Sequence, residues 1–238
     1  MFKGTVIFFH IPKTAGTSFT KLLAQVYGLE NIYSISGQRH EEDIARFKSF
    51  GKEKRDSYRV VTGHRSDKLL DDVKEPAFYI AFLREPIDLA LSSYHYIQQT
   101  EHNRHHEEVS KLRSFSDFLK WQSCHGFDSM QTRYLAGVDP RTKPAKKNLT
   151  QLKGLRAEQV SAAARTMARE IENIYLLENM DEALLDIAKK LGWSTIPDIG
   201  MSNRSVRPPT SSLSAAEVSL AQDIHDLDIR LYEEFKSD

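Results

Sequence analysis

The chain has 238 residues, 40% of them hydrophobic and 10% aromatic, which is enough to bury a sizeable core. Its 33 basic and 33 acidic residues give a formal net charge of zero, which argues against a protein that binds nucleic acid through bulk electrostatics. The single cysteine, Cys124, excludes a disulfide within the chain and a cysteine-rich zinc site. Any anion site must therefore be local.

The first predicted element is a strand over Val6–Phe9, and the loop that follows at 10–18 reads His-Ile-Pro-Lys-Thr-Ala-Gly-Thr-Ser. A bend of small residues lets several backbone N–H groups point at one anion, and a helix beginning at Thr17 adds the positive end of its dipole. Lys13 supplies a full charge. The pattern predicts a phosphate-binding loop. The alternative is an ordinary strand-to-helix turn, in which Thr, Gly and Ser are turn and N-cap residues.

The position of Lys13 separates this loop from the ATP-binding loop of P-loop proteins. There the lysine follows the last glycine, in the pattern G-x-x-x-x-G-K-[ST], whereas Lys13 precedes Gly16. In addition, Arg84 stands at the strand end where a magnesium-binding aspartate is expected. A P-loop-type ATP-dependent kinase therefore fits poorly but stays an alternative, as does a nucleotide-binding protein without catalysis.

Strands and helices alternate along the chain. Helices are predicted at 18–27, 41–50, 86–99, 116–122, 129–135, 157–172, 181–191 and about 214–236, and strands at 6–9, 58–62, 77–83 and 174–177. The apolar run at 77–83 suits a central parallel strand covered on both faces. We expect an α/β protein with a P-loop-like, three-layer fold, in which helices flank a central parallel sheet. Residues 1–238 are predicted to form a single domain, with 214–236 as a packing helix.

A second anion-binding element is predicted where the 77–83 strand ends. Arg84 follows this strand, and Ser92 lies about two turns into the next helix. Ligands of open α/β sheets bind at such strand ends, and a guanidinium offers a planar fork of donors to phosphate oxygens. The alternatives are an ion pair between Arg84 and a neighbouring acid, Glu85 or Asp88, and a helix-surface hydroxyl at Ser92.

The two elements together resemble the sulfotransferases, in the branch that contains the heparan sulfate 2-O-sulfotransferases and related bacterial proteins. The family's loop pattern, close to P-K-[TS]-[AG]-[GS]-[TS]-[ST], matches residues 12–18. Its pattern R-x-P-x-x-x-x-x-S matches at Arg84, Pro86 and Ser92. The resemblance covers most of the chain, although beyond these motifs and residues 62–65 it is only a similarity of pattern.

The resemblance implies a binding site for 3′-phosphoadenosine 5′-phosphosulfate (PAPS). The residues implied to hold its 5′-phosphosulfate are Lys13, Thr14, Ala15, Gly16, Thr17 and Ser18. Arg84 and Ser92 are implied to bind its 3′-phosphate. A late loop in the family returns over the nucleotide, so Arg204 or Arg207 is expected at the 3′-phosphate or the adenine, the alternative being a surface arginine.

The activity implied by the resemblance is transfer of the sulfuryl group of PAPS to a hydroxyl acceptor, with release of 3′,5′-ADP. The branch implies a carbohydrate acceptor. By analogy with phosphoryl transfer, positioning and electrostatics supply most of the rate, so we expect Lys13 to stabilise the departing bridging oxygen. No metal is required by this scheme.

A base is also needed, because the acceptor hydroxyl loses its proton as the new bond forms, and a histidine suits this task. His64 is the candidate, since Gly63-His64 follows the 58–62 strand and matches the element that carries the catalytic histidine of the 2-O-sulfotransferase branch. The alternative is a histidine held by backbone partners. His10 is the weaker candidate base and is interpreted as a packing residue at the end of a strand.

The remaining predictions concern location and metals. The first strand begins almost at once, which leaves no room for a signal peptide, and no apolar stretch approaches the roughly 20 residues that span a bilayer. We therefore expect a cytoplasmic protein. The polar stretch 100–114 is predicted to be a mobile surface loop, and its His102, His105 and His106 match no recognised metal-ligand spacing. The oligomeric state is not predicted.

Overall fold

The computed structural model describes residues 1–37, 39–137, 155–198 and 207–236. Packing divides these residues into two compact units. The first unit is drawn from Met1–Leu83 and Arg169–Asn203, and the second from Arg84–Ala168 and Arg204–Asp238. Each unit has its own hydrophobic core. The expectation of a single domain over 1–238 stays a prediction.

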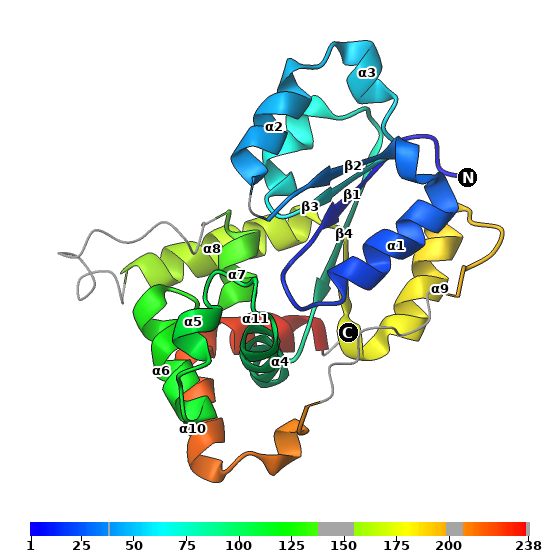
Figure 1. Cartoon of the computed structure of the whole chain (residues 1–238). Helices are drawn as coiled ribbons and strands as arrows, with labels where there is room; N and C mark the ends of the chain where they lie inside the picture. The colour runs from blue at the N-terminus through cyan, green and yellow to red at the C-terminus, as the bar shows by residue number, and fades with distance from the viewer. Residues whose placement is uncertain (38, 138–154, 199–206, 237–238) are drawn as a thin grey trace. The chain divides into compact units, whose positions relative to one another are not determined.

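The first unit is built on a parallel sheet (Figure 1). Within the described residues the sheet has five strands in the order β2-β3-β1-β4-β5, and each neighbouring pair is parallel. The strands are β1 Thr5–Phe9, β2 Ile32–Ile35, β3 Val60–Gly63, β4 Ala77–Leu83 and β5 Asn173–Leu176. Because β1 lies between β3 and β4, its loop leaves from the middle of the sheet. The predicted α/β fold with a central parallel sheet is confirmed.

Helices cover both faces of this sheet. They are α1 Gly16–Tyr27, α2 His40–Ser49, α3 Lys52–Asp56 and α9 Met180–Leu191, with short 3-10 helices at Leu29–Asn31, Ser66–Asp72 and Leu177–Asn179. Figure 1 shows α1 and α9 on one face and α2 on the other. As predicted, α1 ends at Tyr27; the next residue is Gly28, whose φ of 84° suits a residue without a side chain.

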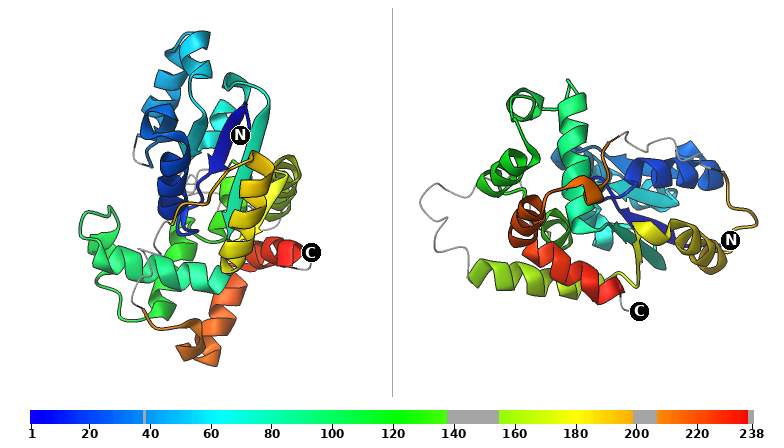
Figure 2. Two further views of the ribbon diagram at one scale, coloured as in Figure 1. Left: turned by 90° about the vertical axis from the view of Figure 1, so that its right-hand side faces the viewer. Right: turned by 90° about the horizontal axis from the view of Figure 1, so that it is seen from below.

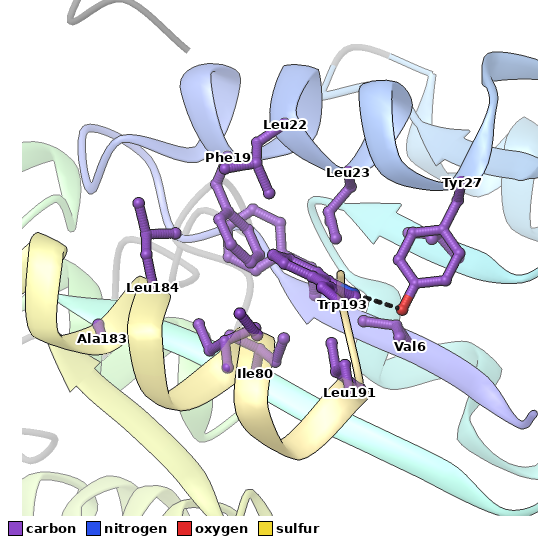
Figure 3. Close-up of a cluster of buried hydrophobic side chains, with 14 of the residues drawn as sticks. Val6, Phe19, Leu22, Leu23, Tyr27, Ile80, Ala183, Leu184, Leu191 and Trp193 are labelled. Atoms are coloured by element: carbon purple, nitrogen blue, oxygen red, sulfur yellow. Dashed lines mark hydrogen bonds between the residues drawn. The ribbon is translucent and has the colours of Figure 1, made fainter. Parts of the chain in front are cut away.

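The core of the first unit follows from the alternation of side chains along each strand. Val60 faces the cluster beneath α1 and α9, whereas its neighbour Val61 faces the cluster beneath α2. Between the sheet and these two helices lie large side chains such as Phe19 (Figure 3). The indole Nε1 of Trp193 donates a hydrogen bond to the Tyr27 hydroxyl at 3.1 Å, so the polar ends of both aromatic residues are paired inside this core.

The described part of the second unit is helical. Its helices are α4 Pro86–Gln99, α5 His106–Val109, α6 Phe115–His125, α7 Met130–Leu135, α8 Leu155–Glu170, α10 Ala215–Ile224 and α11 Asp226–Lys236, with a 3-10 helix at Thr210–Ser212. The last residues of α8 belong to the first unit. Aromatic and aliphatic side chains of α4, α5, α6 and α10 form the core. Figure 2 shows α11 running alongside α8, where Arg165 Nη2 pairs with Glu234 Oε1 at 2.6 Å.

The observed elements differ from the predicted ones in several places. The short helix α3 was not predicted, nor was the edge strand β2, because it is short and its exposed Ser34 interrupts the apolar pattern. The segment 100–114, predicted to be a mobile loop, contains α5, and its Val109 is fully buried. The stretch predicted as one helix over 214–236 is divided at His225 into α10 and α11. No helix among the described residues combines the length and apolar character that crossing a bilayer requires.

Candidate active site

The loop between β1 and α1 has an unusual backbone. Lys13 and Ala15 have φ values of 66° and 58°, in the left-handed region that residues with a side chain rarely adopt. Such conformations cost on the order of 1–3 kcal/mol each and persist where the surroundings enforce them. Backbone that alternates into the left-handed region turns successive N–H groups toward one side, which forms a concave site for an anion.

Buried contacts enforce this loop conformation. The Thr14 hydroxyl donates to the Ile11 carbonyl at 2.9 Å, and the Ile11 N–H donates to the Phe9 carbonyl at 3.0 Å. Ala15 occupies the N-cap position of α1 and has no side-chain oxygen to accept a hydrogen bond from the first turn. The first turn of α1 also contains no acidic residue. Neither the N-cap side chain nor an acidic residue of the first turn therefore competes with an anion for the positive end of this helix.

Gly16 is required by a close approach rather than by its backbone angles. A Cβ atom placed on Gly16 would lie 1.8 Å from Cδ2 of His10, far inside contact distance. The His10 ring is in turn fixed by stacking, with its centroid 5.8 Å from that of Phe8 and 4.6 Å from that of His64. The glycine of the loop and the two histidines thus form one packed assembly within the first unit.

His64 is oriented by the end of β1. It follows β3 directly, and its Nδ1 lies 2.9 Å from the main-chain oxygen of His10. A carbonyl oxygen only accepts, so Nδ1 is the donor and carries the proton in neutral His64. The lone pair is then on Nε2, as a general base requires. Backbone also packs against this ring, since a Cβ on Gly37 would lie 2.6 Å from His64 Cδ2.

His10 is a poor base at neutral pH. Burial, and to a lesser extent the positive charge that His64 can carry, together lower its pKa to about 3. His10 therefore stays neutral while it stacks on His64 and accepts its hydrogen bond. This agrees with the interpretation of His10 as a packing residue at a strand end.

Arg84 and Ser92 lie together in the second unit. Arg84 follows the last residue of β4, and its Nη1 donates to the hydroxyl of the buried Ser92 at 3.1 Å. Arg84 Nε and Nη2 also contact Asp88 Oδ2, at 2.8 and 2.6 Å. Glu85 caps α4 instead, because its carboxylate accepts from the N–H groups of Ile87 and Asp88. Of the two acids considered as partners of Arg84, Asp88 forms the ion pair.

A second guanidinium joins this cluster. Arg207 Nη2 donates to Asp88 Oδ1, so one carboxylate is shared by Arg84 and Arg207. Burial acts to raise the pKa of Asp88, but the hydrogen bond from Arg207 and the charge of Arg84 outweigh it and lower the pKa. Asp88 is therefore ionised at neutral pH, and the three side chains carry a net charge of +1. Arg204, the other predicted arginine, lies outside the described residues.

A model of the sulfotransferase family matches residues 3–233 of the chain. The chain belongs to the sulfotransferase family. Membership implies that this sulfotransferase uses PAPS and a sulfuryl acceptor. It also decides against the ATP-dependent kinase and the non-catalytic binding protein that the sequence left open.

Further comparisons add little to this assignment. A crystal structure of a sulfotransferase from Alicyclobacillus acidocaldarius is 16% identical and covers 98% of this chain and 100% of its own, with a TM-score of 0.45. No curated protein sequence matches this sulfotransferase.

Two contacts of the predicted site residues were missed by sequence reasoning. One is the stacking of His10 on His64, which depends on the pairing of β1 with β3. The other is Gln131, whose amide bonds the main chain of Arg84 from 47 positions away. Neither contact has a local signal in the sequence.

The histidines of the 100–114 segment have structural partners. His106 Nδ1 lies 2.9 Å from the Ile97 carbonyl, and the His105 ring packs edge-on against Trp121 with centroids 5.2 Å apart. Throughout the described portion of the sulfotransferase, no group of three or more His, Cys, Asp or Glu side chains is placed to hold a metal ion. The segment is thus anchored to α4 and α6 through these histidines.

Proposed function

We propose that this sulfotransferase moves the sulfuryl group of PAPS to a hydroxyl of a carbohydrate. The orientation of His64 carries the proposal. Its Nδ1 donates to the carbonyl of His10, in the loop at 10–18, so in the neutral form of the ring the lone pair is on Nε2. The Gly63-His64 element resembles the one that carries the catalytic histidine in the heparan sulfate 2-O-sulfotransferase branch, and this resemblance is the reason for a carbohydrate acceptor.

The loop is proposed to bind the 5′-phosphosulfate of PAPS. Backbone N–H groups of residues 13–18 and the start of α1 donate to its oxygens, and the left-handed conformations of Lys13 and Ala15 favour this concave arrangement. The Thr17 hydroxyl is exposed at the start of α1, whereas Thr14 and Ser18 are buried and shape the loop.

The arginine cluster is proposed to bind the 3′-phosphate. Arg84, Ser92 and Arg207 supply donors of the kind that phosphate oxygens accept, and the net charge of +1 favours an anion. Asp88 holds the two guanidinium groups in place when no phosphate is bound. Arg204 is proposed as a further contact on the basis of the family resemblance alone.

The chemical step is proposed as an in-line displacement. The acceptor hydroxyl gives its proton to His64 Nε2 as its oxygen bonds to sulfur, and the bond from sulfur to the bridging phosphate oxygen breaks. Lys13 stabilises the negative charge that collects on that oxygen, and 3′,5′-ADP leaves. Atoms and charge balance without a redox step.

A transfer assay with labelled PAPS tests the proposed acceptor class. The full chain is incubated with a panel of glycans and a matched panel of small alcohols and phenols, and product formation is compared with release of 3′,5′-ADP. We expect labelled glycan and 3′,5′-ADP in equal amounts. Transfer to small hydroxyl compounds with none to any glycan would overturn the carbohydrate assignment, and 3′,5′-ADP release that does not depend on acceptor would contradict the proposed transfer.

A further inference from the structure

The side-chain amide of Gln131 forms hydrogen bonds with both the main-chain N–H and the main-chain carbonyl of Arg84. Its Oε1 accepts from the Arg84 N–H at 2.8 Å, and its Nε2 donates to the Arg84 carbonyl at 2.9 Å. A neighbouring strand makes the same pair of bonds to a residue in a sheet. Gln131 is only 1% exposed, so both bonds form where an unpaired polar atom would be costly.

These two hydrogen bonds fix the main chain of Arg84, from which its side chain extends. Arg84 lies in the short connection between the end of β4 and the start of α4. From there its guanidinium reaches Asp88 and Ser92 on α4. Recognition of phosphate by arginine depends on the orientation of the guanidinium plane, so a displaced main chain would misdirect several donors at once.

Gln131 is itself held from the C-terminal helices. Its main-chain N–H donates to Asp228 Oδ2 at 3.1 Å. The other carboxylate oxygen accepts from the main-chain N–H of Thr132 at 2.8 Å and from its hydroxyl at 2.7 Å. Asp228 on α11 therefore caps the first turn of α7, in place of the helix's own N-cap residue. A chain of hydrogen bonds, which are buried at Asp228 and partly buried at Arg84, connects α11 through α7 to Arg84.

We propose that Gln131 is a positioning residue for the 3′-phosphate of PAPS, setting the orientation of Arg84 while Asp228 sets the orientation of Gln131. This inference rests on the proposed function, in which Arg84 binds that phosphate. Because Gln131 acts through Arg84, its loss weakens recognition of the 3′-phosphate and leaves recognition of the rest of the nucleotide intact.

The test compares 3′,5′-ADP with 5′-AMP, which lacks the 3′-phosphate, by isothermal titration calorimetry on the full chain. The ratio of the two dissociation constants measures the contribution of the 3′-phosphate. We expect a ratio of roughly 100-fold for the wild type, since charge-assisted bonds to phosphate are strong. In Gln131→Met, which keeps the side-chain length but removes the amide, the ratio falls about tenfold. The dissociation constant for 5′-AMP does not change, and KM for PAPS rises while kcat is retained.

Gln122→Met is the matched control. Gln122 is also a buried amide of the second unit, 3% exposed, but its Oε1 faces His225 Nε2 at 3.3 Å instead of Arg84. Its replacement is expected to lower the melting temperature and leave the ratio at the wild-type value. If Gln131→Met does not fold, Asp228→Asn is the second variant. It removes one carboxylate oxygen beneath α7, and the ratio is expected to fall about threefold.

The outcomes separate this inference from the proposed function. In one outcome, Arg84→Met lowers the ratio of the two dissociation constants to about 1 while Gln131→Met and Asp228→Asn keep the wild-type ratio. That result overturns the role of Gln131, and the proposed function stands. If Arg84→Met leaves the ratio unchanged, both fail. An equal loss of affinity for the two nucleotides in Gln131→Met also overturns the inference. Because Gln131 acts through Arg84, the double variant Arg84→Met, Gln131→Met is expected to have the same ratio as Arg84→Met alone.

Discussion

Lys13 lies in a loop whose strained backbone is explained by its proposed task. A charge about 4 Å from the departing oxygen contributes about 4 kcal/mol at an effective dielectric near 20. We therefore expect Lys13→Ala to lower the single-turnover rate of sulfuryl transfer about 1000-fold. Lys21→Ala, which removes an exposed charge from α1, is the control and should keep the wild-type rate. Equal rates for the two variants would refute the role of Lys13.

His64 is expected to affect turnover and not nucleotide binding. Removing a general base lowers rates by about 10²–10⁴-fold, so His64→Asn should lower kcat by that factor and leave the dissociation constant of 3′,5′-ADP unchanged. The exposed His102 gives the control, His102→Asn, which should keep the wild-type kcat. A wild-type kcat in His64→Asn would contradict the assignment.

Gly16 and His10 are expected to be coupled. The added Cβ of Gly16→Ala would displace the His10 ring, which stacks on His64 and supports the loop. The substitution should raise KM for PAPS and lower the free energy of unfolding by about 1–3 kcal/mol, which is typical of overpacking. Removing the ring in the double variant Gly16→Ala, His10→Ala should recover part of the loss in KM. If the double variant is worse by the sum of the two single effects, the contact does not explain Gly16.

Sequence reasoning reached the residues that motifs contain and missed those that only the fold brings together. Lys13, His64 and Arg84 each stand at a strand end within a recognisable pattern. Gln131 has no such pattern, because its partner is a main chain 47 positions away. Any glutamine or asparagine side chain of suitable length and position could form these hydrogen bonds, so a glutamine in the sequence does not by itself predict this contact.

Among the elements, the junction between α10 and α11 places two buried ionisable groups close together in sequence. Burial lowers the pKa of His225 to about 4 and raises the pKa of Asp228 to about 6. Neutral His225 accepts from the Ser129 N–H at 3.1 Å, so both groups cap the start of α7. The predicted single C-terminal helix is divided at this junction, where both side chains turn to the start of α7.

The two groups are expected to oppose each other in the pH dependence of stability. Between about pH 4 and 6.5 the folded chain binds fewer protons than the unfolded chain at His225, so this group adds stability as pH rises. At Asp228 the folded chain binds more protons between about pH 4 and 6, so this group removes stability as pH rises. Each contribution is about 3 kcal/mol, and they largely cancel in the wild type.

Single substitutions should expose each contribution. In Asp228→Asn the free energy of unfolding should rise with pH more steeply than in the wild type, and in His225→Gln it should rise less or fall. Urea denaturation at pH 4, 5, 6 and 7 measures these slopes. Parallel pH profiles for the wild type and both variants would show that neither group titrates in this range.

The order of elements followed from sequence periodicity more reliably than their ends did. The helix from Pro86 to Gln99 was predicted with its observed bounds, because a proline marks its start and an apolar strand precedes it. β2 was missed because a short strand at the edge of a sheet is defined by its pairing with β3, which a local pattern does not reveal.

For the whole molecule, a formal net charge of zero means that anion binding depends on local placement of charge. Lys13 in the first unit and the Arg84 cluster in the second are proposed as two such places. Both lie within residues 3–233, which the sulfotransferase family model matches. The proposed carbohydrate acceptor and the expected cytoplasmic location stay predictions.

The most direct measurement of the central claim is the binding of 3′,5′-ADP, 5′-AMP and 3′-AMP to the wild type, Lys13→Ala and Arg84→Met. We expect 3′,5′-ADP to bind the wild type more tightly than either monophosphate. Lys13→Ala should reduce only the contribution of the 5′-phosphate, and Arg84→Met only that of the 3′-phosphate. Equal dissociation constants for the three nucleotides in the wild type, or the reverse pattern in the variants, would contradict the account.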